Sequence, residues 1–338
     1  MDLQLLDHSL AANGQPPFRA RQVWEWAARG ATGYEEMTNL PGALREWLAQ
    51  AVPFSSLEPR EQRHASDGTV KALFSTADGR PIEAVLMRYR DQRRSICVSS
   101  QSGCPLTCSF CATGRMKFAR NLTASEILDQ ALHFRRIEAI DHCVFMGMGE
   151  PMLNLDAVLA ACERLPDVGI THRRTTISTV GWIPGIERLA ECEMPIRLAL
   201  SLHAADEALR SELMPVNERY PLAEVLEACR AFYARKRRRV FVEYVMLAGV
   251  NDRYPQALAL ADALSGGRRD AAPIFKVNLI PYNATDSGDG APFQGSSRES
   301  IAAFRAALES RGVPVTVRLT RGRDIAAACG QLAAERPT

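Results

Sequence analysis

The first segment of the chain, residues 1–60, is expected to be helical because its apolar side chains recur every three or four residues. The stretch FRARQVWEWAARG stops at Gly30, and LPGALREWLAQAV supplies a second helix. Residues 66–90 change to an alternating apolar and polar pattern with a turn signal at Asp78–Gly79. This second pattern predicts a β-hairpin.

From residue 95 onwards, short apolar runs alternate with amphipathic stretches. The runs predict strands at Ser95–Ser99, His142–Met146, Arg174–Ser178, Ile196–Leu202, Val240–Met246, Phe275–Ile280 and Val315–Leu319. Helices are expected between them, at Thr123–Ile137, Leu155–Leu165, Pro184–Glu191, Leu222–Lys236, Tyr254–Leu264 and Ser297–Arg311. Capping boxes are predicted at Thr123-x-x-Glu126 and Ser296-x-x-Glu299.

The order of these elements predicts the fold class. Strands that are apolar throughout are typical of a parallel sheet that is covered on both faces. Six successive β/α units therefore predict an α/β fold with a partly open (β/α)6 barrel, whose active groups follow the carboxyl ends of its strands. We expect a helical accessory domain over residues 1–60, a β-hairpin extension over 61–94, and the barrel with a C-terminal segment over 95–338.

The composition is typical of a soluble globular protein. Hydrophobic residues make up 46% of the 338 positions and charged residues 24%, and no apolar run reaches membrane-spanning length. The start, MDLQLLDHSLAANG, lacks the basic and apolar regions of a signal peptide. Nine cysteines without an export signal indicate a reducing cytoplasm, where thiols serve metals or chemistry.

The net charge is only +2, but the basic residues are clustered at Arg93–Arg94, Arg173–Arg174, Arg235–Arg239, Arg268–Arg269 and Arg318–Arg323. Patches of this kind can neutralise RNA phosphates. The alternative is a set of solvated surfaces. For the RKRRR run at Arg235–Arg239 taken alone, a solvated helix end is the simpler interpretation.

The stretch Gln101–Phe118, QSGCPLTCSFCATGRMKF, carries the most specific chemical pattern. Cys104, Cys108 and Cys111 form a C-x3-C-x2-C triplet, whereas a structural zinc site or an electron-transfer [4Fe–4S] cluster usually has four protein ligands. Three cysteines leave one iron of a cluster free, and S-adenosylmethionine can chelate it through its amino and carboxylate groups. One electron then releases a 5′-deoxyadenosyl radical. A zinc site completed by a distant Cys or His, or a disulfide pair with a spare thiol, are the alternatives.

Further polar groups follow the predicted strand ends. GMGEPMLN places Gly147, Gly149 and Glu150 where backbone carbonyls and a carboxylate can hold the ammonium group of S-adenosylmethionine, and a plain tight turn is the alternative. Ser178 either hydrogen-bonds the cofactor or caps the next helix. His203 is expected to position the cofactor rather than to act as a base.

The triplet, with Phe110 just before its last cysteine, resembles the radical-SAM signature. The fuller string ICVSSQSGCPLTCSFCATGRMKFARNLTASEI resembles the RlmN/Cfr family of RNA adenine methyltransferases, and the likeness extends from FRARQVWEWAARG to RGRDIAAACGQL. The resemblance implies a [4Fe–4S] cluster held by the triplet. It also implies one S-adenosylmethionine that donates a methyl group and a second that forms the radical.

The same resemblance assigns roles to individual residues. It implies that Cys329 carries the methyl group, that its methylene radical adds to the adenine ring, and that Cys97 then attacks the sulfur of Cys329 to release the product. Glu83 in RPIEAV matches the family's proton acceptor, and a surface carboxylate on the hairpin is the alternative. Cofactor contacts are implied for Gly149, Glu150, Ser178, Ser201, Leu202, His203 and Asn283.

C2 and C8 of adenine are poor nucleophiles, so a radical route is needed to methylate them. The resemblance implies an adenosine of 23S ribosomal RNA as the target, with certain tRNAs as a second target, and it favours C2. Alternatives are methylation at C8, a radical-SAM reaction on another RNA, a peptide or a small molecule, and a noncatalytic metal-stabilised RNA-binding module.

We expect a cytoplasmic monomer that does not bind membranes and that receives electrons from a donor such as flavodoxin or ferredoxin. One departure from the family concerns the loop ATDSGDGAPFQGSS after Asn283, which is longer than usual. Because a long loop near the predicted site can touch RNA, the reaction type is predicted more firmly than the RNA substrate.

Overall fold

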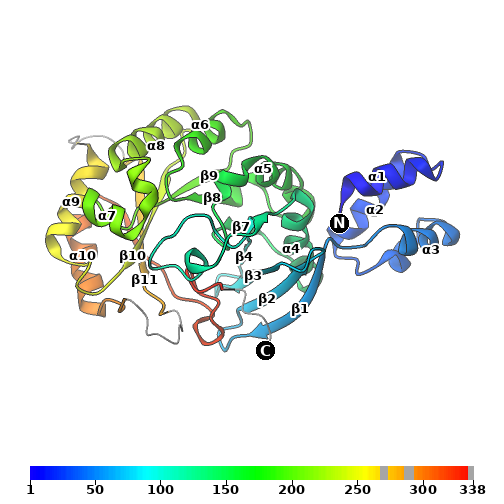
Figure 1. Cartoon of the computed structure of the whole chain (residues 1–338), viewed down its shortest axis with the longest axis horizontal. Helices are drawn as coiled ribbons and strands as arrows, with labels where there is room; N and C mark the ends of the chain where they lie inside the picture. The colour runs from blue at the N-terminus through cyan, green and yellow to red at the C-terminus, as the bar shows by residue number, and fades with distance from the viewer. Residues whose placement is uncertain (267–272, 285–292, 334–338) are drawn as a thin grey trace.

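The computed structural model describes residues 1–266, 273–284 and 293–333. In these ranges ten strands form one sheet, in the order β1-β2-β3-β4-β7-β8-β9-β10-β11-β12, and β5 pairs separately with β6. The pairs from β4 to β12 are parallel, and those from β1 to β4 are antiparallel. The parallel part curves into an open barrel with helices outside it (Figure 1). The predicted fold class is therefore confirmed.

The strands lie close to their predicted positions. Their bounds are β1 (Leu57–His64), β2 (Val70–Thr76), β3 (Pro81–Arg88), β4 (Arg94–Cys97), β5 (Gln101–Ser102), β6 (Arg120–Asn121), β7 (His142–Phe145), β8 (Thr175–Thr179), β9 (Arg197–Ser201), β10 (Val240–Met246), β11 (Phe275–Pro281) and β12 (Val315–Val317). Strand β8 is buried along its whole length, as the continuous runs predicted. Most of the long loop after Asn283 lies outside the described residues.

The helices also follow the predicted pattern. Their bounds are α1 (Leu3–Ala12), α2 (Phe18–Arg29), α3 (Gly42–Ala51), α4 (Ala124–Ile137), α5 (Leu155–Arg164), α6 (Ile183–Glu191), α7 (Glu207–Leu213), α8 (Leu222–Lys236), α9 (Tyr254–Ser265) and α10 (Arg298–Ser310). Helix α7 was not predicted, because seven residues are too few to show a clear apolar period. No helix in the described ranges combines the length and the apolarity that a membrane span needs.

Two predictions about local structure are wrong. Strand β1 begins inside the segment for which only helices were expected, and its residues after Leu57 are all exposed, so it shows no alternating apolar pattern. It extends the predicted hairpin to three antiparallel strands. At α10, the cap is Ser297, whose hydroxyl accepts a hydrogen bond from the Ser300 backbone N–H at 3.1 Å, and not Ser296.

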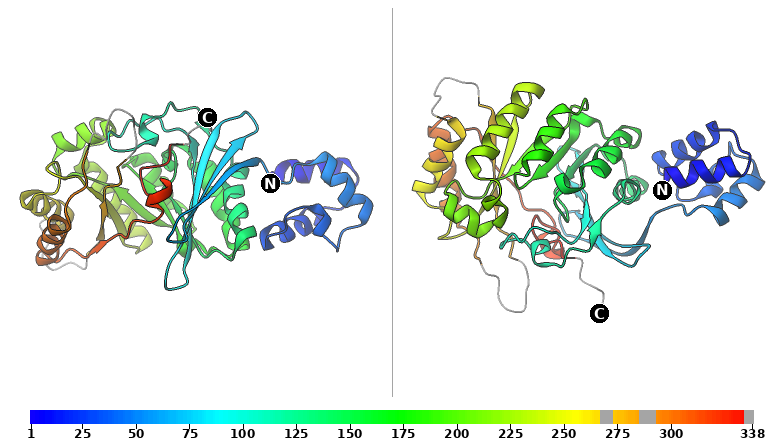
Figure 2. Two further views of the ribbon diagram at one scale, coloured as in Figure 1. Left: turned by 90° about the horizontal axis from the view of Figure 1, so that it is seen from below. Right: turned by 45° about the horizontal axis from the view of Figure 1, so that its top comes forward.

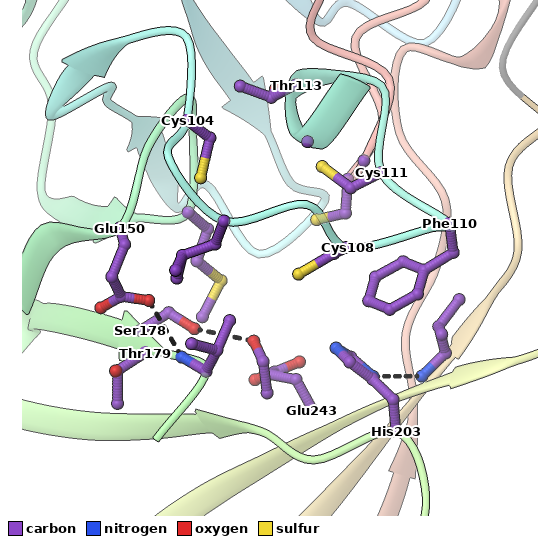
Figure 3. A pocket seen from close by; sticks show the side chains of 18 of the residues that line it. Cys104, Cys108, Phe110, Cys111, Thr113, Glu150, Ser178, Thr179, His203 and Glu243 are labelled. Atoms are coloured by element: carbon purple, nitrogen blue, oxygen red, sulfur yellow. Dashed lines mark hydrogen bonds between the residues drawn. The ribbon is translucent and has the colours of Figure 1, made fainter. Parts of the chain in front are cut away.

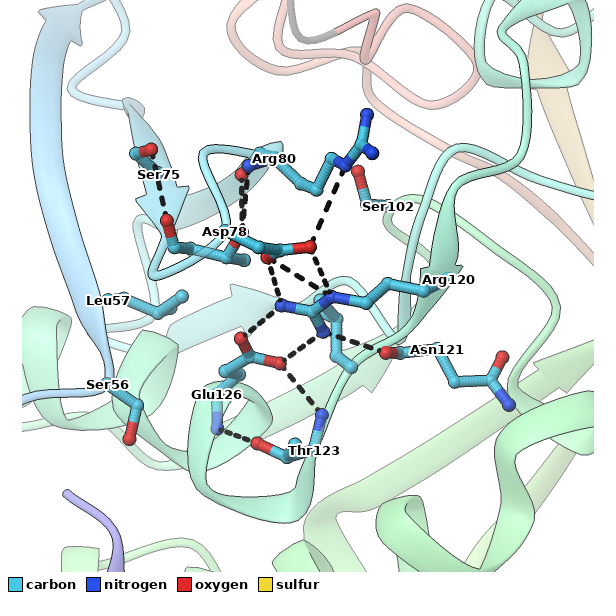
Figure 4. Close-up of polar contacts among 12 residues, drawn as sticks. Ser56, Leu57, Ser75, Asp78, Arg80, Ser102, Arg120, Asn121, Thr123 and Glu126 are labelled. Atoms are coloured by element: carbon cyan, nitrogen blue, oxygen red, sulfur yellow. Dashed lines mark hydrogen bonds and ion pairs between the residues drawn. The ribbon is translucent and has the colours of Figure 1, made fainter.

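The β2–β3 turn is fixed against the loop that carries the three cysteines. Arg120 in β6 contacts Asp78 in this turn and Glu126 in α4, each with an N–O distance of 2.7 Å (Figure 4). Glu126 also completes the predicted capping box with Thr123. Because β5 and β6 pair at the two ends of residues 103–119, these contacts fix the base of the cysteine loop.

The three N-terminal helices lie to one side of the barrel (Figure 2). They contact it through α2: Trp24 Nε1 donates to Asp167 Oδ2 at 2.7 Å, and Arg135 Nε donates to the Ala28 carbonyl at 3.4 Å. The apolar face of α2, which includes Val23 and Ala27, is buried in the same core as the barrel. The division into three domains stays a prediction.

The chain after β12 runs between the hairpin and the cysteine loop (Figure 1). On the hairpin side, the Gly322 backbone N–H donates to Asp67 Oδ2 at 3.1 Å. On the loop side, the Ala112 backbone N–H donates to the Gly330 carbonyl at 2.8 Å. These contacts place Cys329 at the open end of the barrel.

Candidate active site

A cavity opens at the carboxyl ends of the parallel strands, where this fold places active groups. We call it the central cavity. Its walls come from the cysteine loop, from β7 to β11 and the loops after them, and from the chain after β12 (Figure 3). The lining residues include Cys104, Cys108, Cys111, Gly149, Glu150, Ser178, Ser201, His203, Glu243, Arg318 and Cys329.

The cysteine loop is held on two sides by backbone hydrogen bonds. The Ser109 N–H donates to the carbonyl of Leu213, at the end of α7, at 3.0 Å. The Ala112 N–H donates to Gly330, next to Cys329. The loop therefore connects a barrel helix to the C-terminal segment.

The three thiols face the central cavity from one side (Figure 3). Burial raises the pKa of Cys104 to about 12 and that of Cys108 well above its usual value. A buried thiolate needs a positive partner, and metal ions supply one. In the described residues, no three His, Cys, Asp or Glu side chains converge on a point where one ion would sit. The thiolates that hold an iron–sulfur cluster do not need to converge on one point, because each thiolate binds a different iron.

The carboxylate of Glu150 is buried at the wall of this cavity. Its Oε2 accepts a hydrogen bond from the Val180 N–H and its Oε1 one from the Met152 N–H, both at 3.0 Å. Burial raises the pKa of Glu150 to about 7, so a positively charged ligand group would stabilise the carboxylate. Gly149 has φ +95°, and a Cβ there would lie 2.5 Å from that of Gln101, so only glycine fits this turn.

Ser178 and Ser201 come from the ends of β8 and β9, with their Oγ atoms 3.4 Å apart. His203 follows β9, and its Nδ1 accepts a hydrogen bond from the Val245 N–H at 3.0 Å. The proton of the neutral ring is therefore on Nε2. Burial, and then the charge of Arg210, lower the pKa of His203 to about 3. A neutral imidazole supports the positioning role that the sequence suggested.

A second cavity adjoins the central one. Tyr89, Cys97, Asn283, Leu319 and Arg321 are among its lining residues, and Met146, Ile280, Arg318 and Cys329 line both cavities. Cys329 thus lies at the junction, with the cysteine triplet on one side and Cys97 on the other. Its side chain is accessible from within the cavities although protein surrounds it. This burial raises the pKa of Cys329, and Arg318 opposes the effect.

Besides Cys97, which lines only the second cavity, three predicted residues lie away from the wall of the central cavity. Leu202 packs in the hydrophobic core, and Asn283 lines only the second cavity. Glu83 is buried on β3 and lines neither cavity: it forms an ion pair with Lys71 at 2.8 Å and accepts a hydrogen bond from the Ala333 N–H at 3.0 Å. The roles assigned to these three residues stay predictions.

Comparison with known proteins identifies the family. Residues 98–261 match the radical SAM superfamily, and residues 1–53 match the ribosomal RNA large subunit methyltransferase N-terminal domain. The chain is 48% identical to the probable dual-specificity RNA methyltransferase RlmN of Heliobacterium modesticaldum, over 94% of this chain and 84% of the relative. It is 44% identical to the probable dual-specificity RNA methyltransferase RlmN of Thermus thermophilus, over 99% of this chain and 93% of the relative. This chain belongs to the RlmN family.

A solved structure supports the same assignment for this RlmN-family chain. The radical SAM methyltransferase from Sphaerobacter thermophilus superposes on it with a TM-score of 0.91 at 45% identity, covering 99% of this chain and 98% of that one. Members of the radical SAM superfamily use a [4Fe–4S] cluster and S-adenosylmethionine. The residues around the central cavity fit both cofactors.

In this RlmN-family chain, Cys104, Cys108 and Cys111 would hold three irons of the cluster and leave one iron for S-adenosylmethionine. The carboxylate of Glu150 and the backbone at Gly149 would hold the ammonium group. When bound, the cofactors supply the 5′-deoxyadenosyl radical.

The sequence did not predict two charged residues of the site. Glu243 on β10 and Arg318 after β12 form an ion pair with an N–O distance of 3.2 Å, and Asn278 Nδ2 donates to Glu243 Oε1 at 2.8 Å. The available signal was the single Glu inside the apolar run VFVEYVM. A buried strand carries a glutamate only when its carboxylate has a partner. Arg318 gave no signal beyond its place in a basic cluster.

In this RlmN-family chain, a buried positive charge also lies close to Cys108 of the cysteine loop. Arg210 on α7 is fully buried, contacts Asn217, and donates from Nη2 to the Val180 carbonyl at 2.7 Å. Burial lowers its pKa to about 10. Its charge favours the thiolate of Cys108 and disfavours a proton on His203. Arg210 therefore acts on a cysteine of the triplet and on a cavity residue at once.

The RKRRR run connects the end of α8 to the start of β10. Because both cavities lie at the carboxyl ends of the strands, this run is at the opposite end of the barrel. Arg235, Arg237 and Arg239 are exposed there. Its position favours the solvated helix end over a contact with RNA at the active site, whereas Arg318 and Arg321 line the second cavity.

Proposed function

We propose that this protein methylates a ring carbon of adenosine in RNA by radical SAM chemistry, with Cys329 as the methyl carrier. The proposed target is C2 of an adenosine in 23S ribosomal RNA, with tRNA as a second substrate. The names and sequence identities of the relatives support RNA as the substrate. The observation that carries the proposal is the position of Cys329, between the cysteine triplet and Cys97.

Cys329 has to react first with a group in the central cavity and then with a group in the second cavity. From the central cavity, its sulfur accepts the methyl group of S-adenosylmethionine: a C–S bond forms and S-adenosylhomocysteine leaves. The bound cofactors later supply the radical that activates this methyl group. The adenine ring would lie in the second cavity, where the activated methyl carbon of Cys329 forms the new bond to the ring. The ring then loses one proton and one electron, the latter to the bound cofactors, and the result is a thioether that joins the RNA to the protein.

Cys97 would release the product. Its thiolate attacks the sulfur of Cys329, and a disulfide forms as the bond from that sulfur to the methylene carbon breaks. The carbon keeps the electron pair and takes up a proton to become the methyl group of the product, and a cellular reductant then restores both thiols. Burial raises the pKa of Cys97 to about 12, so the attack needs a base to remove the thiol proton. Glu83 is proposed to take the ring proton of adenine, for which it has to leave Lys71 and Ala333.

The experiment that tests this proposal uses anaerobic turnover with RNA, S-adenosylmethionine and a reductant such as flavodoxin. Cys97→Ala should accumulate a covalent protein–RNA species on a denaturing gel, because the release step is missing. Cys329→Ala and the double variant should form none. Cys192→Ala is the matched control, because this half-buried cysteine lies outside both cavities and should turn over normally.

Normal turnover by Cys97→Ala would assign the release step to another thiol and contradict the proposal. Loss of iron from both single variants would show that the two cysteines are structural. Mass spectrometry of the modified nucleotide distinguishes C2 from C8, and a C8 product would overturn the proposed position while leaving the cysteine roles intact.

A further inference from the structure

The second cavity has a rim that the proposed chemistry does not use. Its inner end holds Cys97 and Cys329, and its mouth lies between the β3–β4 turn and the segment after β12. Leu319 lines this mouth with 76% of its surface exposed. The position of this exposed apolar side chain, at the entrance of the cavity that contains Cys329, puts it where a substrate base has to pass.

A stack of a tyrosine and two guanidinium groups joins the β3–β4 turn to the segment after β12 at this mouth. The guanidinium carbon of Arg93 lies 3.9 Å from the centre of the Tyr89 ring, and that of Arg321 lies 5.2 Å from it. Arg93 Nε is buried and has no hydrogen-bond partner among the described residues. A guanidinium plane held on an aromatic ring is preorganised to meet a phosphate or a base.

Two arginines that line this cavity already have acidic partners. Arg321 is paired with Asp67 at an N–O distance of 3.7 Å, and Arg318 deeper in the cavity is paired with Glu243. Arg90, on the same turn as Arg93, is exposed. The β3–β4 turn therefore presents the positive charge at the mouth, while the segment after β12 presents the apolar side chain.

We propose that this rim, formed by Tyr89, Arg93, Leu319 and Arg321, is the docking site for the RNA strand on both sides of the target nucleotide. Arg93 contacts a phosphate of that strand. Leu319 packs against the base next to the target and takes the place that the target base leaves when it enters the second cavity. The proposal rests on the proposed function, because it takes RNA as the substrate, and it adds the route by which the base reaches Cys329.

Leu319→Ser and Arg93→Gln test the two sides of the rim, with Ile137→Ser and Arg239→Gln as controls. Ile137 is an exposed apolar residue at the end of α4, and Arg239 is an exposed arginine of the RKRRR run, both outside the cavities. Loss of one stacking contact should raise KM for RNA about tenfold in Leu319→Ser. Arg93→Gln should weaken binding and lower the salt slope by about one, and Arg93→Lys should restore the slope.

A 2-aminopurine at the target position of a short RNA reports on the base itself. Its fluorescence should rise on binding to the parent chain, because the base leaves its neighbours, and this rise should be smaller in Leu319→Ser. Iron content and thermal unfolding, measured alongside, verify that the variants are folded.

The outcomes separate the two proposals. If the parent chain fails to modify RNA, the proposed function is wrong. If the parent chain modifies RNA and both rim variants keep its KM, salt slope and fluorescence change, the strand enters elsewhere and the rim proposal is overturned. An effect of the control variants as large as that of the rim variants would overturn it as well.

Discussion

The backbone N–H of Ala112 donates a hydrogen bond to the carbonyl of Gly330 at 2.8 Å. Ala112 follows the last cysteine of the triplet, and Gly330 follows Cys329. The bond therefore ties the two cysteine-bearing segments directly together, although more than two hundred residues separate them. A second link lies next to it: Thr113 Oγ1 donates to the Leu332 carbonyl at 2.6 Å, fully buried. Together these bonds set the distance between the cysteine triplet and Cys329.

Thr113→Val should loosen the segment that carries Cys329 without disturbing the cysteine loop. The valine keeps the shape of the side chain but leaves the buried carbonyl of Leu332 unpaired, at a cost of about 1–3 kcal/mol. We expect faster amide hydrogen exchange over residues 326–333 and unchanged exchange in β8. Equal exchange in the variant and the parent chain would show that the hydroxyl does not hold the segment.

The cysteine triplet should be required for the cluster. Protein purified without air should be brown and contain about four irons and four sulfides per chain. Cys104→Ala, Cys108→Ala and Cys111→Ala should each lose the iron and the production of 5′-deoxyadenosine, whereas Cys192→Ala should keep both. Stoichiometric zinc without iron in the anaerobic parent protein would contradict the radical reaction.

Protonation of His203 should couple stability to pH. In the unfolded chain this residue takes up a proton near pH 6.5, but in the folded chain its pKa is about 3. The unfolded state therefore binds more protons between these values, so this contribution to the free energy of unfolding is full above pH 6.5 and decreases as the pH falls toward 3.

His203→Asn is the variant that isolates this effect. His203 has φ +59°, a conformation that asparagine tolerates, and the amide oxygen can accept the hydrogen bond from Val245. Urea unfolding at a series of pH values should give a shallower pH dependence for the variant. Part of the slope will remain, because burial also lowers the pKa of His133 to about 4. Identical slopes for the two proteins would indicate that His203 takes up its proton at the same pH in the folded and unfolded chains.

The features that could be predicted from the sequence are those that local pattern encodes. The parallel strands were found because each is a continuous apolar run, and the cap of α4 because Thr123 and Glu126 lie in one short motif. The triplet was recognisable because its three cysteines lie within eight residues. In each case, neighbouring positions in the chain carry the whole signal.

The remaining features depend on contacts between distant segments. The ion pair joins Glu243, in the middle of β10, to Arg318, just after β12, and the two residues are 75 positions apart. Likewise, the placement of Cys329 between two cavities follows from its hydrogen-bonded connection to the cysteine loop. No local pattern specifies such a contact. Strand β1 was missed for a different reason: a polar edge strand has no apolar period to detect.

The Glu243–Arg318 pair should be strongly coupled, because Glu243 is 3% exposed and Arg318 neutralises it at the junction of the two cavities. Arg318→Met removes the positive partner and leaves a buried carboxylate whose one remaining partner in the described ranges is the Asn278 amide, which should cost about 3–5 kcal/mol of unfolding free energy. Glu243→Gln in the same chain removes the uncompensated charge. The double variant should therefore be more stable than Arg318→Met alone. Urea unfolding of the four proteins gives the coupling energy, expected at about 0.5–3 kcal/mol. Additive effects would mean that the two side chains do not interact in solution, and that the charge balance beside Cys329 is set by other residues.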